Sequence, residues 1–245
     1  MKRVLNKLST FLPYKYQLIL QCFIDRRFNY KIGKYRTLSQ AGQDYWIINE
    51  VFNKKKEGYF VDIGAADGVN ISNTYILEKK YGWNGVCVEA NPEFYKKLTI
   101  NRNVPCINIC VGEKEEEVEF IISGLDGGIK NLLSNSHIKK NSTKSQTRKM
   151  ISKPLEAILK DVNAPSVIDY LSIDIEGAEY YALKNFPFHK YTFRAITIER
   201  PNKLLQELLA LKGYVVVKRI PDLDFFYVHS SFMSSFKKNI FDFYW

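Results

Sequence analysis

A stretch of ten residues, Tyr59 to Gly68, limits the fold of this chain more than any other feature of its sequence. Its first half is almost continuously apolar, which is typical of a parallel strand buried on both faces of a sheet. Gly64 and Gly68 follow, and glycine tolerates a positive φ and lets a ligand approach the backbone closely. The stretch therefore predicts a central strand that runs into a ligand-binding turn.

The elements that follow continue this pattern. We expect a helix over residues 74–80 and a second strand over residues 85–89 that ends in Glu89. Glu89 lies 25 residues after Gly64, close to the offset of about 20 residues at which an acid binds a ribose diol in such folds. Because ligands sit over the carboxyl ends of strands in open α/β sheets, these two strand ends predict a nucleoside site.

The acids around the turn indicate which nucleoside binds there. A pyrophosphate requires the spacing G-x-G-x-x-G, whereas this turn has only Gly64 and Gly68 and is flanked by Asp62, Asp67 and Glu89. These carboxylates would repel a phosphate and attract a cation. S-adenosylmethionine carries a sulfonium, an amino group and a ribose, so the pattern predicts this cofactor.

Five motifs, in order along the chain, resemble those of a known family. They are Ser39-Gln40-Ala41-Gly42-Gln43-Asp44, Val61-Asp62-Ile63-Gly64-Ala65-Ala66-Asp67-Gly68, Val88-Glu89-Ala90-Asn91-Pro92, Asp174-Ile175-Glu176-Gly177-Ala178-Glu179 and Ile196-Thr197-Ile198-Glu199. On these motifs the chain resembles the FkbM-type family of S-adenosylmethionine-dependent methyltransferases over roughly residues 37 to 230. The Asp174 motif is the specific part, because the first strand and turn occur throughout methyltransferases of this fold.

The resemblance implies an α/β protein with the Rossmann-like class I methyltransferase fold: a central, mostly parallel seven-stranded sheet with helices on both faces. Beyond the first two strands, we expect strands over residues 104–111, 167–175, 193–199, 214–218 and 225–229, the last inserted antiparallel, and an added edge strand over 118–122. Residues 37–245 would form this domain, preceded by a basic amphipathic helical extension over residues 1–36. Residues 123–153 are too long for an ordinary connection, so we expect a substrate-side loop there.

The resemblance also implies which residues contact the cofactor. A helix over residues 39–53 would bring Gln40 and Gln43 close to it. The complete predicted set of cofactor-binding residues is Gln40, Gln43, Asp62, Gly64, Ala65, Asp67, Gly68, Asn73, Glu89, Ala90, Val111 and Asp174.

Methyl transfer from a sulfonium is an in-line displacement, and an alcohol acceptor must also lose its proton. Asp174 is the predicted catalytic base because it ends a central strand beside the cofactor. Glu199 and His137 are further catalytic candidates. His229 is an alternative histidine base, although its place in an apolar strand favours a structural role. Asp174 and Glu199 also permit a Mg²⁺ site, since hard divalent ions prefer oxygen ligands. In the competing interpretation, Asp174 and Glu176 only hold a turn at a helix terminus.

The net charge of +10 is concentrated in two segments. Residues 1–36 carry +8 and residues 123–153 carry +6, so the rest of the chain is acidic. The basic arm predicts peripheral contact with an anionic membrane or partner, against the alternative of a solvated tail. Residues 18–24 form an apolar run too short to span a bilayer and without a signal-peptide cleavage site, so we expect a cytoplasmic protein. The four cysteines predict reduced core thiols.

The resemblance implies O-methyl transfer to a hydroxyl of a sugar, a glycan or a related small metabolite. The high positive charge leaves a nucleic-acid methyltransferase as an alternative. Against it, no segment like Asn-Pro-Pro-Tyr, which would hold a flipped base, follows the fourth strand. A non-catalytic, membrane- or glycan-associated binding module on the same fold is the second alternative.

Overall fold

The computed structural model describes residues 31–32, 35–133, 146–220 and 223–235. Most of the predicted extension over residues 1–36 therefore lies outside the described residues, and so does His137. The described end of the extension is a small antiparallel hairpin of β1 (Lys31–Ile32) and β2 (Tyr35–Arg36).

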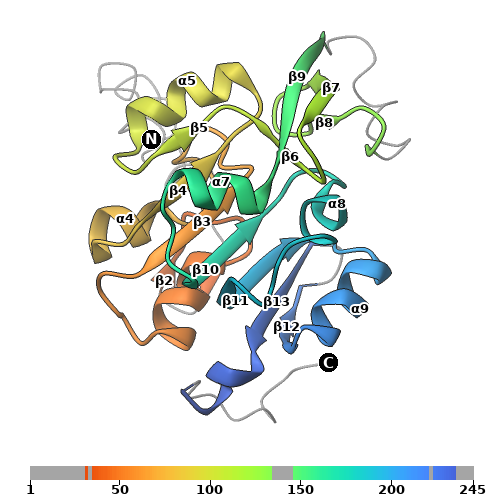
Figure 1. The fold of residues 1–245 in the computed structure, drawn as a ribbon. Helices are drawn as coiled ribbons and strands as arrows, with labels where there is room; N and C mark the ends of the chain where they lie inside the picture. The colour runs from red at the N-terminus through yellow and green to blue at the C-terminus, as the bar shows by residue number, and fades with distance from the viewer. Residues whose placement is uncertain (1–30, 33–34, 134–145, 221–222, 236–245) are drawn as a thin grey trace, which may run out of the picture.

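The main sheet has seven strands in the order β12-β13-β11-β10-β3-β4-β5 (Figure 1). Their bounds are β3 (Tyr59–Ile63), β4 (Asn84–Val88), β5 (Cys106–Ile107), β10 (Val167–Ile173), β11 (Thr192–Glu199), β12 (Tyr214–Arg219) and β13 (Asp224–His229). Strands β5, β4, β3, β10 and β11 pair in parallel, and β13 is antiparallel to both of its neighbours, β11 and β12. This order confirms the predicted Rossmann-like class I methyltransferase fold.

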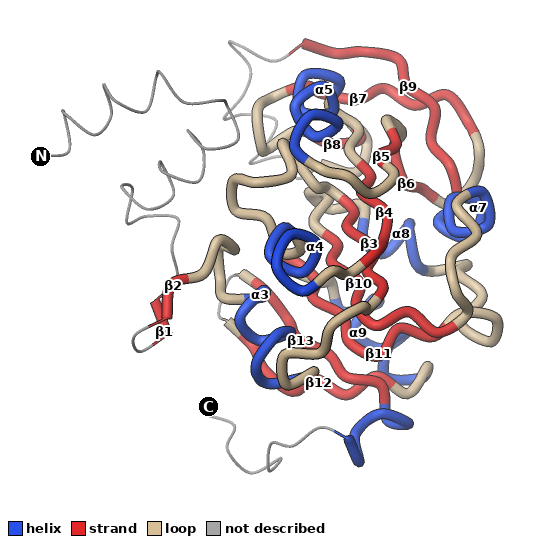
Figure 2. Tube along the Cα trace, turned by 90° about the vertical axis from the view of Figure 1, so that its left-hand side faces the viewer, coloured by secondary structure: helices blue, strands red, loops and turns tan. Residues whose placement is uncertain are grey.

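Helices cover both faces of this sheet, and Figure 2 shows the sheet between them. One face carries α3 (Gln43–Tyr45), the π-helix η1 (Trp46–Val51), α4 (Tyr75–Tyr81) and α5 (Pro92–Asn101); the other carries α7 (Leu155–Asp161), α8 (Glu179–Leu183) and α9 (Lys203–Leu211). Successive side chains of β3 point to opposite faces. Phe60 packs in the core with Trp46 and Leu77, whereas Val61 packs in the core with Leu183. The buried strand predicted from Tyr59 onwards therefore contributes side chains to the hydrophobic cores on both faces of the sheet.

The helix predicted over residues 39–53 is shorter than expected. It begins at Gln43, because Gly42 adopts a left-handed conformation (φ 79°) and Ser39 is drawn into a β-bridge with Ile71. Residues 37–42 are consequently a loop that lies against the segment after the glycine turn.

A second sheet, which the sequence did not predict, has four strands in the order β6-β9-β7-β8. They are β6 (Cys110–Gly112), β9 (Gln146–Pro154), β7 (Glu116–Ile122) and β8 (Gly128–Ile129). The strand predicted over residues 104–111 is in fact divided between β5 and β6, which belong to different sheets. The edge strand predicted over 118–122 is part of β7 and pairs with β9 rather than with the main sheet.

Residues 123–153, expected to form a loop, contain β8 and most of β9, while residues 134–145 lie outside the described part of the chain. The first four residues of β9 are exposed and polar or charged, so they carry no alternating apolar pattern. The ladder with β7 holds β9 in place instead, helped by an ion pair between Lys149 and Glu117. In Figure 1 this sheet lies beyond the carboxyl ends of β3 and β10.

Two further expectations concern thiols and membranes. Cys87, Cys106 and Cys110 are free, with Cys87 and Cys110 buried and Cys106 half-buried, whereas Cys22 lies outside the described residues. Among the described residues, none of the helices has the length and apolar character needed to cross a bilayer.

Candidate functional site

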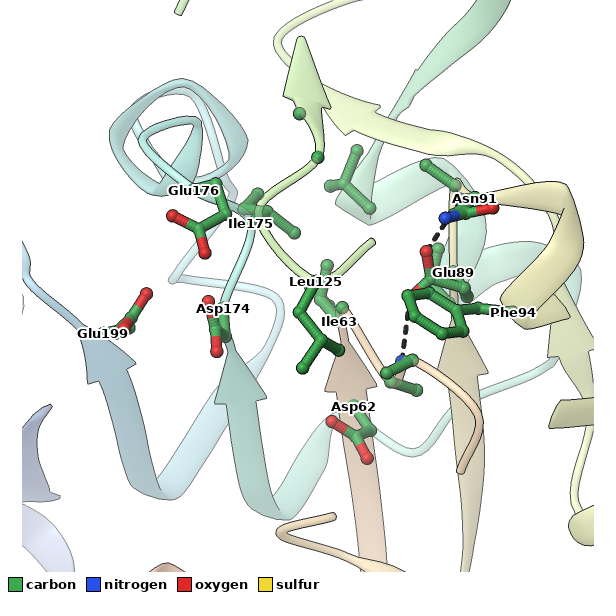
Figure 3. Close-up of a pocket in the computed structure, with 18 of the residues that line it drawn as sticks. Asp62, Ile63, Glu89, Asn91, Phe94, Leu125, Asp174, Ile175, Glu176 and Glu199 are labelled. Carbon is green, nitrogen blue, oxygen red and sulfur yellow. Dashed lines mark hydrogen bonds between the residues drawn. The ribbon is translucent and has the colours of Figure 1, made fainter. Parts of the chain in front are cut away.

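A cavity of about 210 Å³ opens at the carboxyl ends of the parallel strands. Its floor comes from the ends of β3, β4 and β10, and its roof from the turn between β7 and β8, which includes Leu125 (Figure 3). This is the edge at which an open α/β sheet binds its ligands. The second sheet thus supplies one wall of the site that the first strand and turn predicted.

The glycine turn joins the ends of β3 and β10 tightly. Gly64 has a φ of 84°, and a Cβ atom built on it would lie 1.8 Å from the carbonyl oxygen of Asp174. The amide N–H of Asp174 donates to the carbonyl oxygen of Ile63 at 3.0 Å, so the two strand ends cannot separate to make room. Only glycine fits here, and the backbone it exposes forms the base of the cavity.

Glu89 directly follows β4 and is almost completely buried. Its carboxylate accepts hydrogen bonds from the N–H groups of Ala66 (2.8 Å) and Asn91 (2.7 Å), both drawn in Figure 3. Burial raises the pKa of this carboxyl to about 7. Because each carboxylate oxygen has a second lone pair, Glu89 can still accept a hydrogen bond from a ligand hydroxyl.

Asp62 and Asn73 provide acceptors on another wall of the cavity. Asp62 Oδ2 accepts a hydrogen bond from the hydroxyl of Thr74 at 2.5 Å. Asn73 Nδ2 donates to the hydroxyl of Ser172, while Asn73 Oδ1 is buried and has no hydrogen-bond partner among the described residues. A buried acceptor without a partner is unfavourable, so this position suits a ligand donor. The cradle at Gly64, the acid at Glu89 and these acceptors fit the adenosine and amino-acid ends of S-adenosylmethionine.

The opposite side of the cavity holds a cluster of carboxylates. Asp174, Glu176 and Glu199 each offer an oxygen atom within 4.8 Å of the others, and in Figure 3 Asp174 and Glu199 follow the tips of neighbouring strands. Burial, with the charge of Glu199 adding to it, raises the pKa of Asp174 well above its usual range. Burial likewise raises the pKa of Glu176 to about 7. Arg200 Nη2 lies 2.9 Å from Glu199 Oε1 and supplies positive charge to the cluster. Such a cluster can take a proton from a hydroxyl group or hold a divalent ion.

Most of the residues predicted from the sequence meet at this cavity. Those that line it are Gln40, Asp62, Gly64, Ala65, Asn73, Glu89, Ala90, Val111, Asp174 and Glu199.

Three predicted cofactor residues lie behind the cavity instead of lining it. Gln43 donates through Nε2 to Asp224 Oδ2 at 2.6 Å and accepts from the N–H of Ala41, so its amide ties the N-terminal loop to the start of β13. Asp67 accepts from two backbone N–H groups of its own turn. Gly68 packs so closely on Leu98 that a Cβ atom there would lie 2.6 Å from it.

The suggestion that His229 acts as a base is wrong. β13 runs antiparallel to β11, so His229, at the end of β13, lies at the edge of the sheet opposite the cavity. Its Nδ1 is within 2.7 Å of the hydroxyl of Ser231, and its ring packs on Tyr214. This histidine has a local structural role.

Several residues that line the cavity were not predicted as binding residues. They include Asn91, Phe94, Ile109, Cys110, Leu125, Ser172, Glu176 and Arg200. Phe94 lies in the first turn of α5, whose start at Asn91 and Pro92 the sequence does indicate, so this residue could have been found. Leu125 could not, because nothing in the sequence places the β7–β8 turn over the glycine turn.

The comparisons with known proteins agree with these features. The model of the family described as "Methyltransferase FkbM domain" matches residues 62–214 of the chain. No curated protein matches the chain by sequence.

Among solved structures, the methyltransferase domain of METTL16 is 9% identical with a TM-score of 0.46, over 94% of this chain and 81% of that one. The FkbM methyltransferase from Methylobacillus flagellatus KT is 13% identical with a TM-score of 0.44, over 91% of this chain. The match covers 57% of that protein, so this chain spans little more than half of its length. The human methyltransferase 10 domain containing protein is 12% identical with a TM-score of 0.43, over 94% of this chain and 96% of that one.

The family match covers more than half of the chain and includes the glycine turn, Glu89, Asp174 and Glu199. The strand order agrees with it independently, since it is the order of class I methyltransferases. The chain therefore belongs to the FkbM methyltransferase family, as its motifs predicted, and is a methyltransferase for which this family implies S-adenosylmethionine as the methyl donor.

Proposed function

We propose that this methyltransferase is an O-methyltransferase that methylates a hydroxyl group of a sugar, a glycan or a related small metabolite. The observation that carries the proposal is the carboxylate cluster of Asp174, Glu176 and Glu199, which shares a cavity with the cofactor cradle. Carboxylates accept hydrogen bonds from hydroxyl groups and can remove their protons.

Each side of the cavity has its own task in this proposal. Asp62, Gly64, Asn73 and Glu89 would hold S-adenosylmethionine, which when bound supplies an electrophilic methyl group on its sulfonium. Asp174 would accept a hydrogen bond from the acceptor hydroxyl and take its proton as the new bond forms. A positioned base of this kind contributes about 10²–10⁴-fold to the rate.

A divalent cation is the alternative to a protein base. The three carboxylate oxygens of the cluster are close enough to share one ion, and an ion such as Mg²⁺ would lower the pKa of a bound hydroxyl. The two mechanisms differ in their response to a chelator, because a protein base needs no added metal.

The same cluster argues against a nucleic-acid acceptor. Its carboxylates would repel the phosphates that flank a target base, and a positive charge at this mouth comes from Arg200, which is already close to Glu199. We propose instead that the positively charged residues 1–36 make peripheral contact with an anionic membrane or partner. Liposome flotation of the full chain and of a chain without residues 1–36 tests the membrane contact, and equal flotation of the two would rule that contact out.

The proposed reaction is tested by a methyl-transfer screen with S-adenosylmethionine labelled in its methyl group. Sugar nucleotides and free glycans are offered beside amines and oligonucleotides, and the Asp174→Asn variant provides the background. We expect label on the oxygen of a hydroxylated acceptor with the wild type and almost none with the variant. Transfer to amines or oligonucleotides alone would overturn the proposal.

A further inference from the structure

Arg102 lies just after α5, on the side of the glycine turn that faces away from the cavity. Its side chain is wholly buried and forms an ion pair with Glu78, Nε to Oε2, at 2.5 Å. The guanidinium also lies 5.2 Å from the centroid of the Phe60 ring. A buried arginine is stable only when its partners are fixed around it, so the guanidinium occupies one defined position.

From this position Arg102 reaches Asp62 through Thr74. Arg102 Nη2 donates to Thr74 Oγ1 at 2.9 Å, and Thr74 Oγ1 donates to Asp62 Oδ2 at 2.5 Å. Arg102 Nη1 lies 3.9 Å from the same carboxylate oxygen. A guanidinium can only donate, so the single hydroxyl proton of Thr74 is directed to Asp62. The direction of the relay is therefore fixed from Arg102 to Asp62.

This relay has a consequence for the cavity. Burial raises the pKa of Asp62, and the positive charge of Arg102 is the largest influence that opposes the rise. Arg102 Nη1 also donates to the carbonyl oxygen of Gly68 at 3.3 Å, which ties the guanidinium to the end of the glycine turn. One buried cation thus acts on both the carboxylate and the turn.

We propose that Arg102 is a positioning residue for the amino-acid end of the cofactor, because through Thr74 it holds Asp62 as a charged acceptor for the cofactor's amino group. Arg102 itself touches no ligand. The proposal rests on S-adenosylmethionine as the ligand of this cavity.

Two ligands separate this role from general support of the fold. S-adenosylhomocysteine carries the amino-acid end, whereas 5′-methylthioadenosine has the same adenine and ribose without it. A hydrogen bond to a charged group contributes about 1.5–3 kcal/mol. Arg102→Met is therefore expected to weaken the binding of S-adenosylhomocysteine about tenfold or more. Binding of 5′-methylthioadenosine is expected to change little, and both affinities are measured by calorimetry.

Thr74→Val provides the second variant in case Arg102→Met does not fold. It removes the hydroxyl of the relay and leaves the ion pair between Arg102 and Glu78 in place, and it is expected to cause the same selective loss. Lys79→Met is the matched control, because Lys79 also pairs with Glu78 but lies outside the relay. It is expected to leave both affinities unchanged.

The outcomes are distinct. Selective loss of S-adenosylhomocysteine in both relay variants supports the positioning role. An equal loss of affinity for the two ligands, or no loss, would overturn the positioning role while leaving the cofactor assignment intact. Failure of the wild type to bind either ligand would overturn the cofactor assignment itself, and the role of Arg102 with it.

Discussion

The carboxylates on the two sides of the cavity have opposite surroundings. On the cofactor side, Glu89 accepts two backbone N–H groups, and Asp62 is held by Thr74 with Arg102 behind it. On the acceptor side, Asp174 and Glu199 lie next to each other, and their mutual repulsion adds to burial in raising the pKa of Asp174. The groups on the cofactor side are held in place before any ligand binds. On the acceptor side, binding of a proton or a cation reduces the repulsion between the carboxylates.

This difference matches two kinds of task. A cofactor that is the same in every turnover is best bound by rigid groups, because pre-organisation reduces the free energy lost on ordering. A base must exchange its proton in every turnover, and a carboxyl with a raised pKa is a stronger base than an exposed one. The largest predicted effects therefore concern the rigid side.

The glycine cradle provides the largest expected effect on stability. Gly64→Ala places a Cβ atom 1.8 Å from the carbonyl oxygen of Asp174 at a φ of 84°. We expect a loss of more than about 3 kcal/mol in the free energy of unfolding, since backbone strain alone contributes about 1–3 kcal/mol and the clash adds to it.

Gly82→Ala is the matched control for that loss. Gly82 also has a positive φ, 68°, but nothing lies within 4 Å of its added Cβ. The left-handed conformation alone costs an alanine about 1–2 kcal/mol. Urea unfolding of the two variants measures both losses of stability. An equal loss in the two would show that the close contact of β3 and β10 at Gly64 does not contribute to the effect.

The next effect concerns pH and Glu89. Its pKa is about 7 in the folded chain and 4.5 as the ordinary value, so the folded state binds this proton more tightly than the unfolded state. The free energy of unfolding should therefore fall as the pH rises from about 5 to about 8. Each pKa unit corresponds to about 1.4 kcal/mol, which makes the contribution of Glu89 on the order of 3 kcal/mol.

Other buried acids add to this fall, so the informative quantity is the difference between the wild type and Glu89→Gln. The variant should show a clearly smaller fall in urea unfolding measured at both ends of that pH range. Asp224→Asn, behind the cavity at the start of β13, should reduce the fall less, because burial raises the pKa of Asp224 only to about 6. If the free energy of unfolding falls equally in the wild type and in Glu89→Gln, Glu89 is already ionised at low pH in the folded chain.

The smallest expected effect is that of a chelator. If Asp174 is the base, treatment with EDTA should leave kcat unchanged, and added Mg²⁺ should not raise it. Loss of turnover on chelation, restored by Mg²⁺, would instead assign Asp174, Glu176 and Glu199 as metal ligands.

The sequence predicts the rigid side well and the rest of the cavity only in part. Asp62 and Gly64 lie at the end of β3, and Glu89 directly follows the neighbouring parallel strand β4, so their meeting follows from the parallel order alone. The roof comes from the turn between β7 and β8, in the second sheet. That sheet also contains β9, whose first four residues are too polar and exposed to give an apolar pattern. Arg102 ends a helix and has the local sequence of a surface residue; only the packing of α4 and α5 buries it.

For the acceptor side, the sequence predicts Asp174 and Glu199 but not how the third carboxylate joins them. Asp174 directly follows β10, and Glu199 ends the neighbouring parallel strand β11; this pairing can be deduced from the order of the motifs. The third carboxylate, Glu176, joins them because its φ of 53° and the following Gly177 turn the chain sharply after Asp174. Left-handed glutamate is rare, and no sequence pattern indicates it.

The central claim is that the two sides of the cavity divide cofactor binding from proton removal. The most direct test measures kcat for methyl transfer and the Kd for S-adenosylhomocysteine in Asp174→Asn and Asp62→Asn. We predict that Asp174→Asn lowers kcat by about 10²–10⁴-fold and leaves Kd nearly unchanged, whereas Asp62→Asn raises Kd about tenfold. Wild-type kcat in Asp174→Asn, or a loss of S-adenosylhomocysteine binding in it as severe as in Asp62→Asn, would contradict this division.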